Sequence, residues 1–326
     1  MRSPSVLAYH YPLYRDMLLE IGVGKAAYLG AFEGDRMVGA LPGFLKETEL
    51  GTCYSSLPYF GPNAGVVVDE TDTSANELRR KLLGSALSLL QDQPHALTAS
   101  FYSPFLSESW DSYRQALGDA IEVDKQTQYL NLDRLTGFDA SVTYDIRKAQ
   151  KAGVSVSTDL TDDKVSASYQ IYAENCREFA IPQKPWAAVR KLAQEGCANG
   201  LARVYFAHHQ SEIVGALLVL WSKQTSSYYL PCTRTSARAL QSSTLLIAQA
   251  IGEARAAGLK YWNWESSPPD QAGVFNFKKK WGSLVSPYKI FVKRFCEESE
   301  LQQIGRARLD RSFPYFFVYP HSQLVA

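Results

Sequence analysis

The residues best suited to chemistry lie in the last third of the chain. Lys278 follows Phe277 and opens a run of three lysines that ends at Trp281. An ammonium group at Lys278 could hold a phosphate or stabilise the oxyanion that forms when an amine attacks an ester. The next two residues, Lys279 and Lys280, are more typical of a solvated charge run. We expect Phe277 in the core, and Trp281 either in the core or along a cleft.

Three further positions carry groups that could bind or activate a substrate. Glu265 ends a tryptophan-rich segment and is a candidate to hold or deprotonate an attacking amine, although a solvated acid at a strand end fits it equally well. Arg177 ends a predicted helix, where its planar guanidinium suits a phosphate and its charge also suits the helix dipole. Tyr228 and Tyr229 must point to opposite faces of one strand, so one belongs to the core and the other to a cleft.

A loop in the first half supplies two more candidates. Residues 55–65 combine aromatic side chains with Gly-Pro turns, which is typical of a structured cleft wall, and we predict that Tyr59 and Asn63 bind substrate there.

The sequence gives no support for a metal site. The five cysteines contain no CxxC pair, and His208 and His209 lack partners at metal-ligand spacing, so we predict no metal site.

Length and charge limit the class of protein. A chain of 326 residues favours two domains, and 34 Lys and Arg against 33 Asp and Glu leave a net charge of +1. No global field draws in DNA or an anionic membrane. No apolar run reaches the ~20 residues of a membrane helix, and no export signal follows Met1, so we expect a soluble cytoplasmic protein. The oligomeric state stays open.

Basic charge does concentrate locally. Residues 273–311 hold nine Lys and Arg against four acidic residues, a local charge of +5. Such a segment could receive a tRNA acceptor arm or an anionic, nucleotide-linked precursor. It could equally be a surface whose charges are balanced by neighbouring acids. The sequence leaves both interpretations open.

The elements that position these residues occur twice. A β-hairpin is predicted at 28–41 and again at 204–217, and both copies end in Val-Gly-Ala-Leu. Such an internal repeat indicates a duplicated domain. The other predicted elements are helices at 11–21, 75–90, 143–151, 165–176, 186–198 and 240–257, and strands near Cys53 and at 96–102, 226–230 and 261–264. We expect the aromatic segment 311–325 to pack back on a domain.

This order of elements is the plan of the GNAT acyltransferase fold, and its duplicated form resembles the Fem family of peptidoglycan aminoacyltransferases. Three segments carry the resemblance: the basic helix at 145–154, the tyrosine-rich strand at 228–230, and the Phe-Lys motif at 273–282. The resemblance implies an α/β (α+β) fold of two tandem GNAT-like domains with mixed sheets flanked by helices. We place the first domain at 1–140, completed by 305–326, and the second, with the main cleft, at 141–304. By the same resemblance, Lys278 lies at the catalytic cleft and Arg177 contacts the phosphates of the acceptor.

The expected donor site lacks the features of an ordinary coenzyme A site. An ordinary GNAT enzyme holds the pyrophosphate of acetyl-CoA on glycine-rich backbone at a helix N-terminus. Residues 238–245 contain no glycine, and residues 72–77 include the acids Asp72 and Glu77, which would repel a pyrophosphate. We therefore expect no resident cofactor, and aminoacyl-tRNA rather than acyl-CoA as the donor. The expected reaction transfers an aminoacyl or acyl group from an activated ester to an amine of a cell-envelope precursor, related to peptidoglycan or exopolysaccharide.

Two alternatives remain from the sequence. The chain could be a CoA-dependent N-acetyltransferase with a reworked donor site, or a scaffold derived from the GNAT fold that binds an envelope component without catalysis. No unmistakable general base is present, which keeps the scaffold open.

Overall fold

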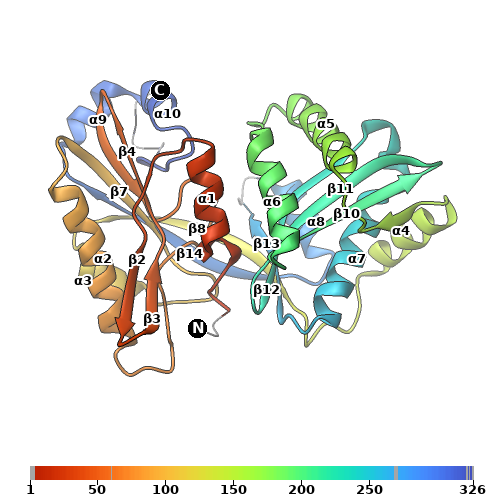
Figure 1. Cartoon of the computed structure of the whole chain (residues 1–326), viewed down its shortest axis with the longest axis horizontal. Coiled ribbons are helices and arrows are strands. Elements are labelled where there is room, and N and C mark those ends of the chain that lie inside the picture. Colours follow the sequence, from red (N-terminus) through yellow and green to blue (C-terminus); the bar gives the residue numbers. More distant parts are fainter. Residues whose placement is uncertain (1–3, 60, 268–270, 321, 323, 325–326) are drawn as a thin grey trace. The chain divides into compact units, whose positions relative to one another are not determined.

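The computed structural model describes residues 4–59, 61–267, 271–320, 322 and 324. The chain forms two compact units, drawn in Figure 1: unit 1 comprises Met1–Gln126 and Ser286–Ala326, and unit 2 comprises Thr127–Val285. These bounds differ from the domains expected at 1–140 with 305–326 and at 141–304. The chain returns to unit 1 earlier than expected because strand β14 (Leu284–Arg294) pairs with β7 (Ala96–Tyr102).

Unit 1 contains a mixed sheet and a small antiparallel sheet. In the mixed sheet the order is β1 (Lys25–Ala26), β4 (Phe44–Thr48), β5 (Gly51–Ser55), β7 and β14, with β5 and β7 parallel. The small sheet holds β2 (Leu29–Glu33), β3 (Arg36–Leu41) and β6 (Val67–Val68). The helices are η1 (Ala8–His10), α1 (Pro12–Glu20), α2 (Ala75–Gln91), α3 (Trp110–Leu117), α9 (Glu298–Ile304) and α10 (Arg306–Ser312). Leu82, Ala86 and Leu90 recur at helical spacing and bury one face of α2.

In unit 2 the strands of the mixed sheet carry helices on both faces. From the end of β8 (Ile121–Asn131), the strand order is β13 (Tyr261–Ser266), β12 (Thr225–Thr233), β11 (Glu212–Trp221), β10 (Ala202–His209) and β9 (Ser155–Ser157). The helices are α4 (Ala140–Lys151), α5 (Asp162–Glu178), α6 (Trp186–Ala198), η2 (Thr235–Leu240), α7 (Ser242–Ala256) and α8 (Ala272–Lys279). Helices α5 and α6 cover one face, and α7 with α4 covers the other (Figure 1).

Both predicted hairpins are present, as β2–β3 in unit 1 and β10–β11 in unit 2. The glycine of the second copy has a steric role. A Cβ atom on Gly215 would lie 2.9 Å from the Cys232 carbonyl oxygen, so glycine allows β11 and β12 to approach closely at this point. The repeated Val-Gly-Ala-Leu pattern therefore reports a packing requirement in this unit.

Strands β12 and β13 pair over a short distance only. Their parallel ladder joins Thr225–Ser227 to Tyr261–Asn263 and stops there. Past Asn263, the register between β13 and β8 shifts. Tyr229 on β12 and Glu265 on β13 thus lie beyond the ladder that joins these two strands.

Across the part of the chain that the structure describes, none of the helices combines the length and the apolar character that crossing a bilayer requires.

Candidate active site

Lys278 lies in the last turn of α8 and is buried, with 5% of its surface exposed. Its Nζ donates hydrogen bonds to the Ser266 carbonyl oxygen at 2.8 Å and to the Ser267 Oγ at 2.9 Å. Burial lowers the pKa of Lys278 to about 8, although the nearby Glu265 carboxylate opposes this effect. A lysine held in this way changes charge close to physiological pH.

Glu265 lies beyond the β12–β13 ladder in a left-handed backbone conformation, with φ of 63°. Asn263 fixes this conformation because its Oδ1 accepts from the Glu265 N–H at 2.9 Å and its Nδ2 donates to Glu265 Oε1 at 3.1 Å. Thr127 Oγ1 donates to the Glu265 carbonyl oxygen at 2.7 Å. A residue other than glycine keeps such a strained backbone conformation only where surrounding contacts hold it, and residues of this kind are concentrated at functional sites.

A second lysine, Lys184, belongs to the same site and was missed by the sequence analysis. It lies between α5 and α6, where its N–H donates to Tyr172 Oη at 3.0 Å and its carbonyl oxygen accepts from Tyr169 Oη at 2.8 Å. Its Nζ lies 5.3 Å from the centroid of the Tyr229 ring. The backbone of Lys184 is therefore held by two tyrosines of α5, and its side chain is directed to β12.

One carboxylate acts on both lysines. Burial lowers the pKa of Lys184 to about 8, and the Glu265 carboxylate opposes that shift. Glu265 acts on Lys278 in the same sense. Three ionisable groups from α8, β13 and the α5–α6 connection are thus electrostatically coupled. Such an arrangement can hold an amine at the carboxylate and stabilise negative charge at an ammonium group.

Strand β8 is connected to α8 by hydrogen bonds from one buried side chain. Gln128 is buried, and its Nε2 donates to the Phe275 carbonyl oxygen at 3.2 Å and to Ser283 Oγ at 3.1 Å. Ser283 Oγ in turn donates to the Lys278 carbonyl oxygen at 2.7 Å. These bonds connect the middle of α8 directly, and its last turn through Ser283, to one residue of the sheet. No local pattern around Gln128 signals this role, since its partners lie far along the chain.

Tyr228 has the core position expected for one of the two tyrosines of β12, and the cleft role of Tyr229 stays a prediction. The Tyr228 ring packs 5.2 Å from the Trp264 ring, within the core cluster on the α7 face, and Tyr229 lies beneath Lys184. The core prediction for Phe277 is wrong, since 37% of this residue is exposed, whereas Trp281 is completely buried. The short helix α8 turns Trp281 inward against Trp264 and leaves Trp281 no exposed surface with which to line a cleft. Lys279 and Lys280 are exposed, as predicted.

The remaining candidates lie outside this cluster of contacts, and their roles stay predictions. Arg177 is exposed near the end of α5, where its Nε donates to the Ala173 carbonyl oxygen at 3.4 Å. Tyr59 and Asn63 belong to unit 1, where both are buried and have positive φ values of 66° and 65°. Asn63 Nδ2 donates to the Ser103 carbonyl oxygen at 3.4 Å, and the Tyr59 N–H donates to that of Tyr315 at 2.9 Å. These contacts shape the loop.

A hollow of about 320 Å³ lies between α5, the end of β12 and the first turn of α7. Its lining comprises Tyr172, Asn175, Phe179, Ile181, Pro231, Cys232, Thr233, Arg238 and Ser243. Tyr172 also binds the backbone of Lys184, so this hollow adjoins the lysine site. The Arg238 guanidinium at its rim makes two hydrogen bonds to the Glu178 carboxylate, at 2.6 and 2.5 Å.

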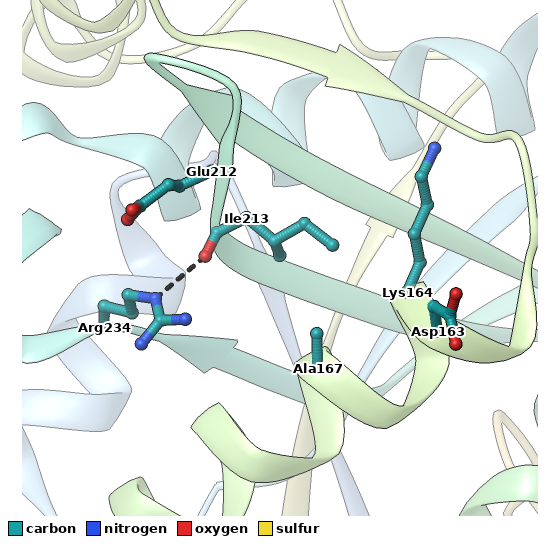
Figure 2. Close-up of a pocket in the computed structure, with 6 residues that line it drawn as sticks. All are labelled: Asp163, Lys164, Ala167, Glu212, Ile213 and Arg234. Carbon is teal, nitrogen blue, oxygen red and sulfur yellow. Dashed lines mark hydrogen bonds between the residues drawn. The ribbon is translucent and has the colours of Figure 1, made fainter.

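A second hollow, of about 510 Å³, contains none of the predicted residues (Figure 2). Its charged side chains are Asp163, Lys164, Glu212 and Arg234, whose formal charges cancel. Arg234 Nε donates to the Ile213 carbonyl oxygen at 2.9 Å, and Lys164 pairs with Asp159. This hollow shows no concentration of charge that would select a ligand. Among the described residues, no group of His, Cys, Asp and Glu is placed to hold a metal ion.

Comparison with known proteins agrees with this geometry. Residues 138–264 match the model of the acetyltransferase (GNAT) domain. Among solved structures, FemX aligns with 88% of this chain and 93% of its own, at 13% identity and a TM-score of 0.70. The chain has a Fem-like, tandem GNAT fold.

Two further solved structures share this Fem-like fold. The C-terminal domain of a putative lysylphosphatidylglycerol synthetase from Agrobacterium fabrum aligns at 13% identity and a TM-score of 0.59, over 91% of this chain and 95% of that one. A tandem GNAT protein from the clavulanic acid biosynthesis pathway aligns at 15% identity and a TM-score of 0.51, over 90% and 98%. No curated protein matches the sequence.

Proposed function

We propose that this Fem-like protein is an N-acyltransferase that moves an aminoacyl or acyl group from an activated ester to an amine of a cell-envelope precursor. The observation that carries the proposal is the coupling of buried Lys278 to Glu265 where β12 and β13 stop pairing. FemX and a lysylphosphatidylglycerol synthetase domain share the fold, which supports an envelope-related reaction.

The proposed reaction needs no covalent enzyme intermediate. Glu265 accepts a proton from the acceptor amine, and the nitrogen attacks the ester carbonyl carbon. The Lys278 ammonium stabilises the oxyanion of the tetrahedral intermediate. The carbon–oxygen bond of the ester then breaks, and the leaving oxygen receives the proton from Glu265. Holding the two substrates in this geometry supplies much of the acceleration.

Aminoacyl-tRNA is the donor that we favour, with no resident cofactor. Gln241, in a left-handed conformation, occupies the N-cap position of α7, and serines occupy the first two positions of the helix. Side chains therefore stand where close backbone approach to a pyrophosphate is needed. Arg238 is already paired with Glu178. The second candidate is a CoA-dependent N-acetyltransferase, which the hollow beside the first turn of α7 and the match to the acetyltransferase domain favour.

The first experiment compares binding of acetyl-CoA, an aminoacylated tRNA pool and a UDP-linked muramyl pentapeptide at one stated salt concentration. Saturable binding of tRNA or of the muramyl peptide, weakened in Lys278→Ala and unchanged in Lys279→Ala, supports the proposal. If acetyl-CoA is the one ligand that binds saturably, the proposal is wrong about the donor and the CoA-dependent reaction is the better account. If none of the three binds, and no acyl group reaches any amine, the non-catalytic scaffold is the better account.

Lys278 is then tested directly with the substrate pair found. We expect Lys278→Ala to lower kcat by about 10²-fold or more, since loss of one oxyanion-stabilising group has effects of this size. Lys279→Ala removes the same charge from an exposed neighbour and should leave turnover unchanged. Unchanged turnover in Lys278→Ala would remove Lys278 from the mechanism.

A further inference from the structure

Helix α4 carries one aromatic and three basic side chains on its outer side. Tyr144, Arg147, Lys148 and Lys151 recur at spacings of three and four residues, which places them on one face of the helix. All four are exposed, and Tyr144, at 67%, is the most exposed of the large hydrophobic residues that the structure describes. We call this face the α4 stripe. It extends about 10 Å along the helix.

The opposite side of α4 explains why the stripe is exposed. Val142 and Ala149 are buried in the core cluster of unit 2, and Ile146 packs against the same cluster. Asp139 caps the helix, because its Oδ1 accepts from the Ser141 N–H at 2.8 Å. The helix is thus anchored by its apolar face and its cap, and the four residues of the stripe take no part in either.

The cations of the stripe also lack acidic partners. Within the described ranges, Arg147, Lys148 and Lys151 make no ion pair, in contrast to the basic segment 273–311 that the sequence singled out. There, Lys289 and Lys293 pair with acids of unit 1, and Arg294, Arg306 and Arg308 also have partners. That segment is also divided between the two units. Among the residues that the structure describes, helix α4 therefore presents three exposed cations without acidic partners on one face.

Helix electrostatics account for part of the stripe only. Cations in the last turn are favoured by the helix dipole, which explains Lys148 and Lys151. Arg147 lies directly before this last turn, where the dipole favours a cation less, and the dipole gives no reason for an aromatic ring in water. An exposed tyrosine among cations is the combination that binds nucleic acid, since cations contact phosphates and a ring stacks on a base.

We propose that the α4 stripe binds the acceptor arm of the tRNA that carries the donor acyl group. This inference rests on the proposed aminoacyl-tRNA donor and names the surface that recognises it. Arg147, Lys148 and Lys151 contact the phosphodiester backbone, and Tyr144 stacks on an unpaired base. An anionic membrane is the less suitable partner, because a helix that inserts into a lipid surface presents several bulky apolar side chains and this face presents one tyrosine.

The test titrates the full chain with a fluorescent RNA minihelix that has an acceptor stem and a single-stranded 3′ end, between 50 and 200 mM salt. Arg147→Gln, Lys148→Gln and Lys151→Gln combined should weaken binding and reduce the slope of log K against log[salt] by about 2. Tyr144→Ala should weaken binding at least about fivefold with little change in slope, as loss of one stacked base does. Circular dichroism confirms that the variants fold.

A matched control replaces Lys223, Arg255 and Lys260, which are also exposed in unit 2 and also comprise one arginine and two lysines. The proposal is overturned if this control lowers the slope as much as the stripe variant does, since the effect is then one of net charge. It is also overturned if the stripe variant binds the minihelix normally, or if the wild type binds anionic vesicles and no RNA.

The outcome is separable from that of the proposed reaction. If transfer from aminoacyl-tRNA depends on Lys278 but the stripe variant binds the minihelix normally, the proposed role of the α4 stripe is wrong and the proposed reaction is supported. If minihelix binding depends on the stripe but no acyl group is transferred to any amine, the role of the α4 stripe is supported and the proposed reaction is wrong.

Discussion

Lys278 is buried with its charge, and this determines how the protein should respond to pH. Its pKa is lowered to about 8 by burial. The protonated lysine is the form that stabilises an oxyanion, so activity should fall as pH rises through about 8. We expect kcat/KM measured between pH 6 and 10 to show this alkaline limb.

Two variants assign the limb to one lysine. Lys278→Arg should move it to higher pH, because a guanidinium stays protonated throughout this range. Lys184 has a pKa lowered to a similar value, so Lys184→Gln is the matched control and should retain a limb near pH 8. A limb that vanishes in Lys184→Gln and persists in Lys278→Arg would assign it to Lys184.

The same burial should cost stability. Below pH 8, Lys278 is protonated in both the folded and unfolded states, so the folded protein bears the full cost of burying the charge. As pH rises from 8 to 10.5, Lys278 loses its proton in the folded state before it does so in the unfolded state. The free-energy cost of burying its charge then disappears. Lys278→Met should therefore raise the free energy of unfolding by about 2 kcal/mol at pH 7.

Denaturant unfolding at several pH values measures this gain. The gain from Lys278→Met should shrink between pH 8 and 10.5, which separates removal of a buried charge from a simple improvement in packing. An increase in stability that is the same at every pH would contradict this account.

At the scale of elements, α8 depends on a single residue of β8. Gln128 binds the Phe275 carbonyl and Ser283, and Ser283 binds the Lys278 carbonyl. Gln128→Leu should lower kcat more than it raises KM, because α8 then holds Lys278 less firmly while the binding groups remain. The loss of these buried hydrogen bonds should also lower the free energy of unfolding by about 1 kcal/mol.

Ser283→Ala offers an independent test of the same support. Since Gln128 and Ser283 act through one chain of hydrogen bonds, the double variant should lose little more activity than either single variant. Additive losses in kcat would show that Gln128 does not position Lys278 through Ser283.

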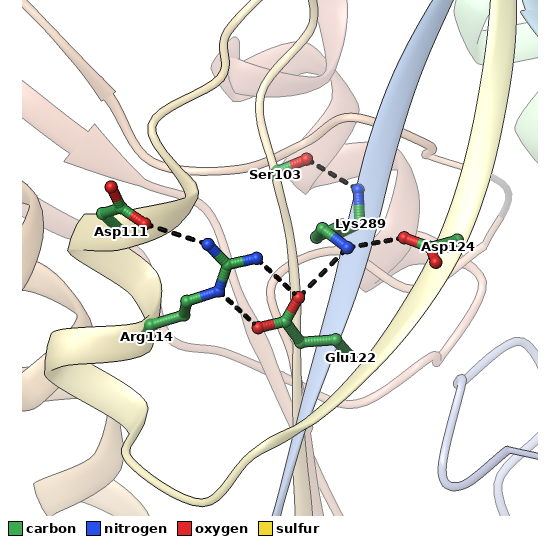
Figure 3. Close-up of polar contacts among 6 residues, drawn as sticks. All are labelled: Ser103, Asp111, Arg114, Glu122, Asp124 and Lys289. Atoms are coloured by element: carbon green, nitrogen blue, oxygen red, sulfur yellow. Dashed lines mark hydrogen bonds and ion pairs between the residues drawn. The ribbon is translucent and has the colours of Figure 1, made fainter.

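At the scale of the whole molecule, the returning strand β14 is tied into unit 1 by an ion network (Figure 3). The Glu122 carboxylate accepts from Arg114 at 2.6 and 3.0 Å and pairs with Lys289 at 3.0 Å. Arg114 also binds Asp111, and Lys289 binds Asp124. The network joins β14 to the consecutive elements α3 and β8, and Lys289 is 165 residues from its partner Asp124.

This network should be measurable through Glu122. Hydrogen bonds from Arg114 lower the pKa of Glu122 to about 2, with a further contribution from Lys289. Because its folded pKa is depressed, its stabilisation is present above about pH 4.5 and is lost as pH falls towards 2. Solvent screens the pair, so we expect Glu122→Gln to cost about 1 kcal/mol at pH 7. Thermal unfolding should show a deficit at pH 7 that disappears near pH 2, and a deficit that persists there would contradict the ionic origin.

Several parts of this protein follow from local sequence. The hairpins β2–β3 and β10–β11, the helix Trp186–Ala198 and the strand Ala96–Tyr102 were predictable, because turn residues and apolar periodicity act within a few residues. Lys278 could also be selected as a candidate site residue from the sequence, since it lies in a compact motif between Phe277 and Trp281. The strands β8 and β14, whose partners are distant, were not predicted.

The tertiary structure alone decided how the site is assembled. Lys184 and Glu265 are far apart along the chain, and only the fold couples them electrostatically. Glu265 lies beyond the β12–β13 ladder in a left-handed conformation held by Asn263. The sequence left two interpretations of the basic segment 273–311 open, and folding paired five of its nine cations with acids, while α4 kept its own exposed. Local patterns determine which face of an element is apolar. Pairing between distant strands and helices determines which charges meet, and no window of sequence contains that information.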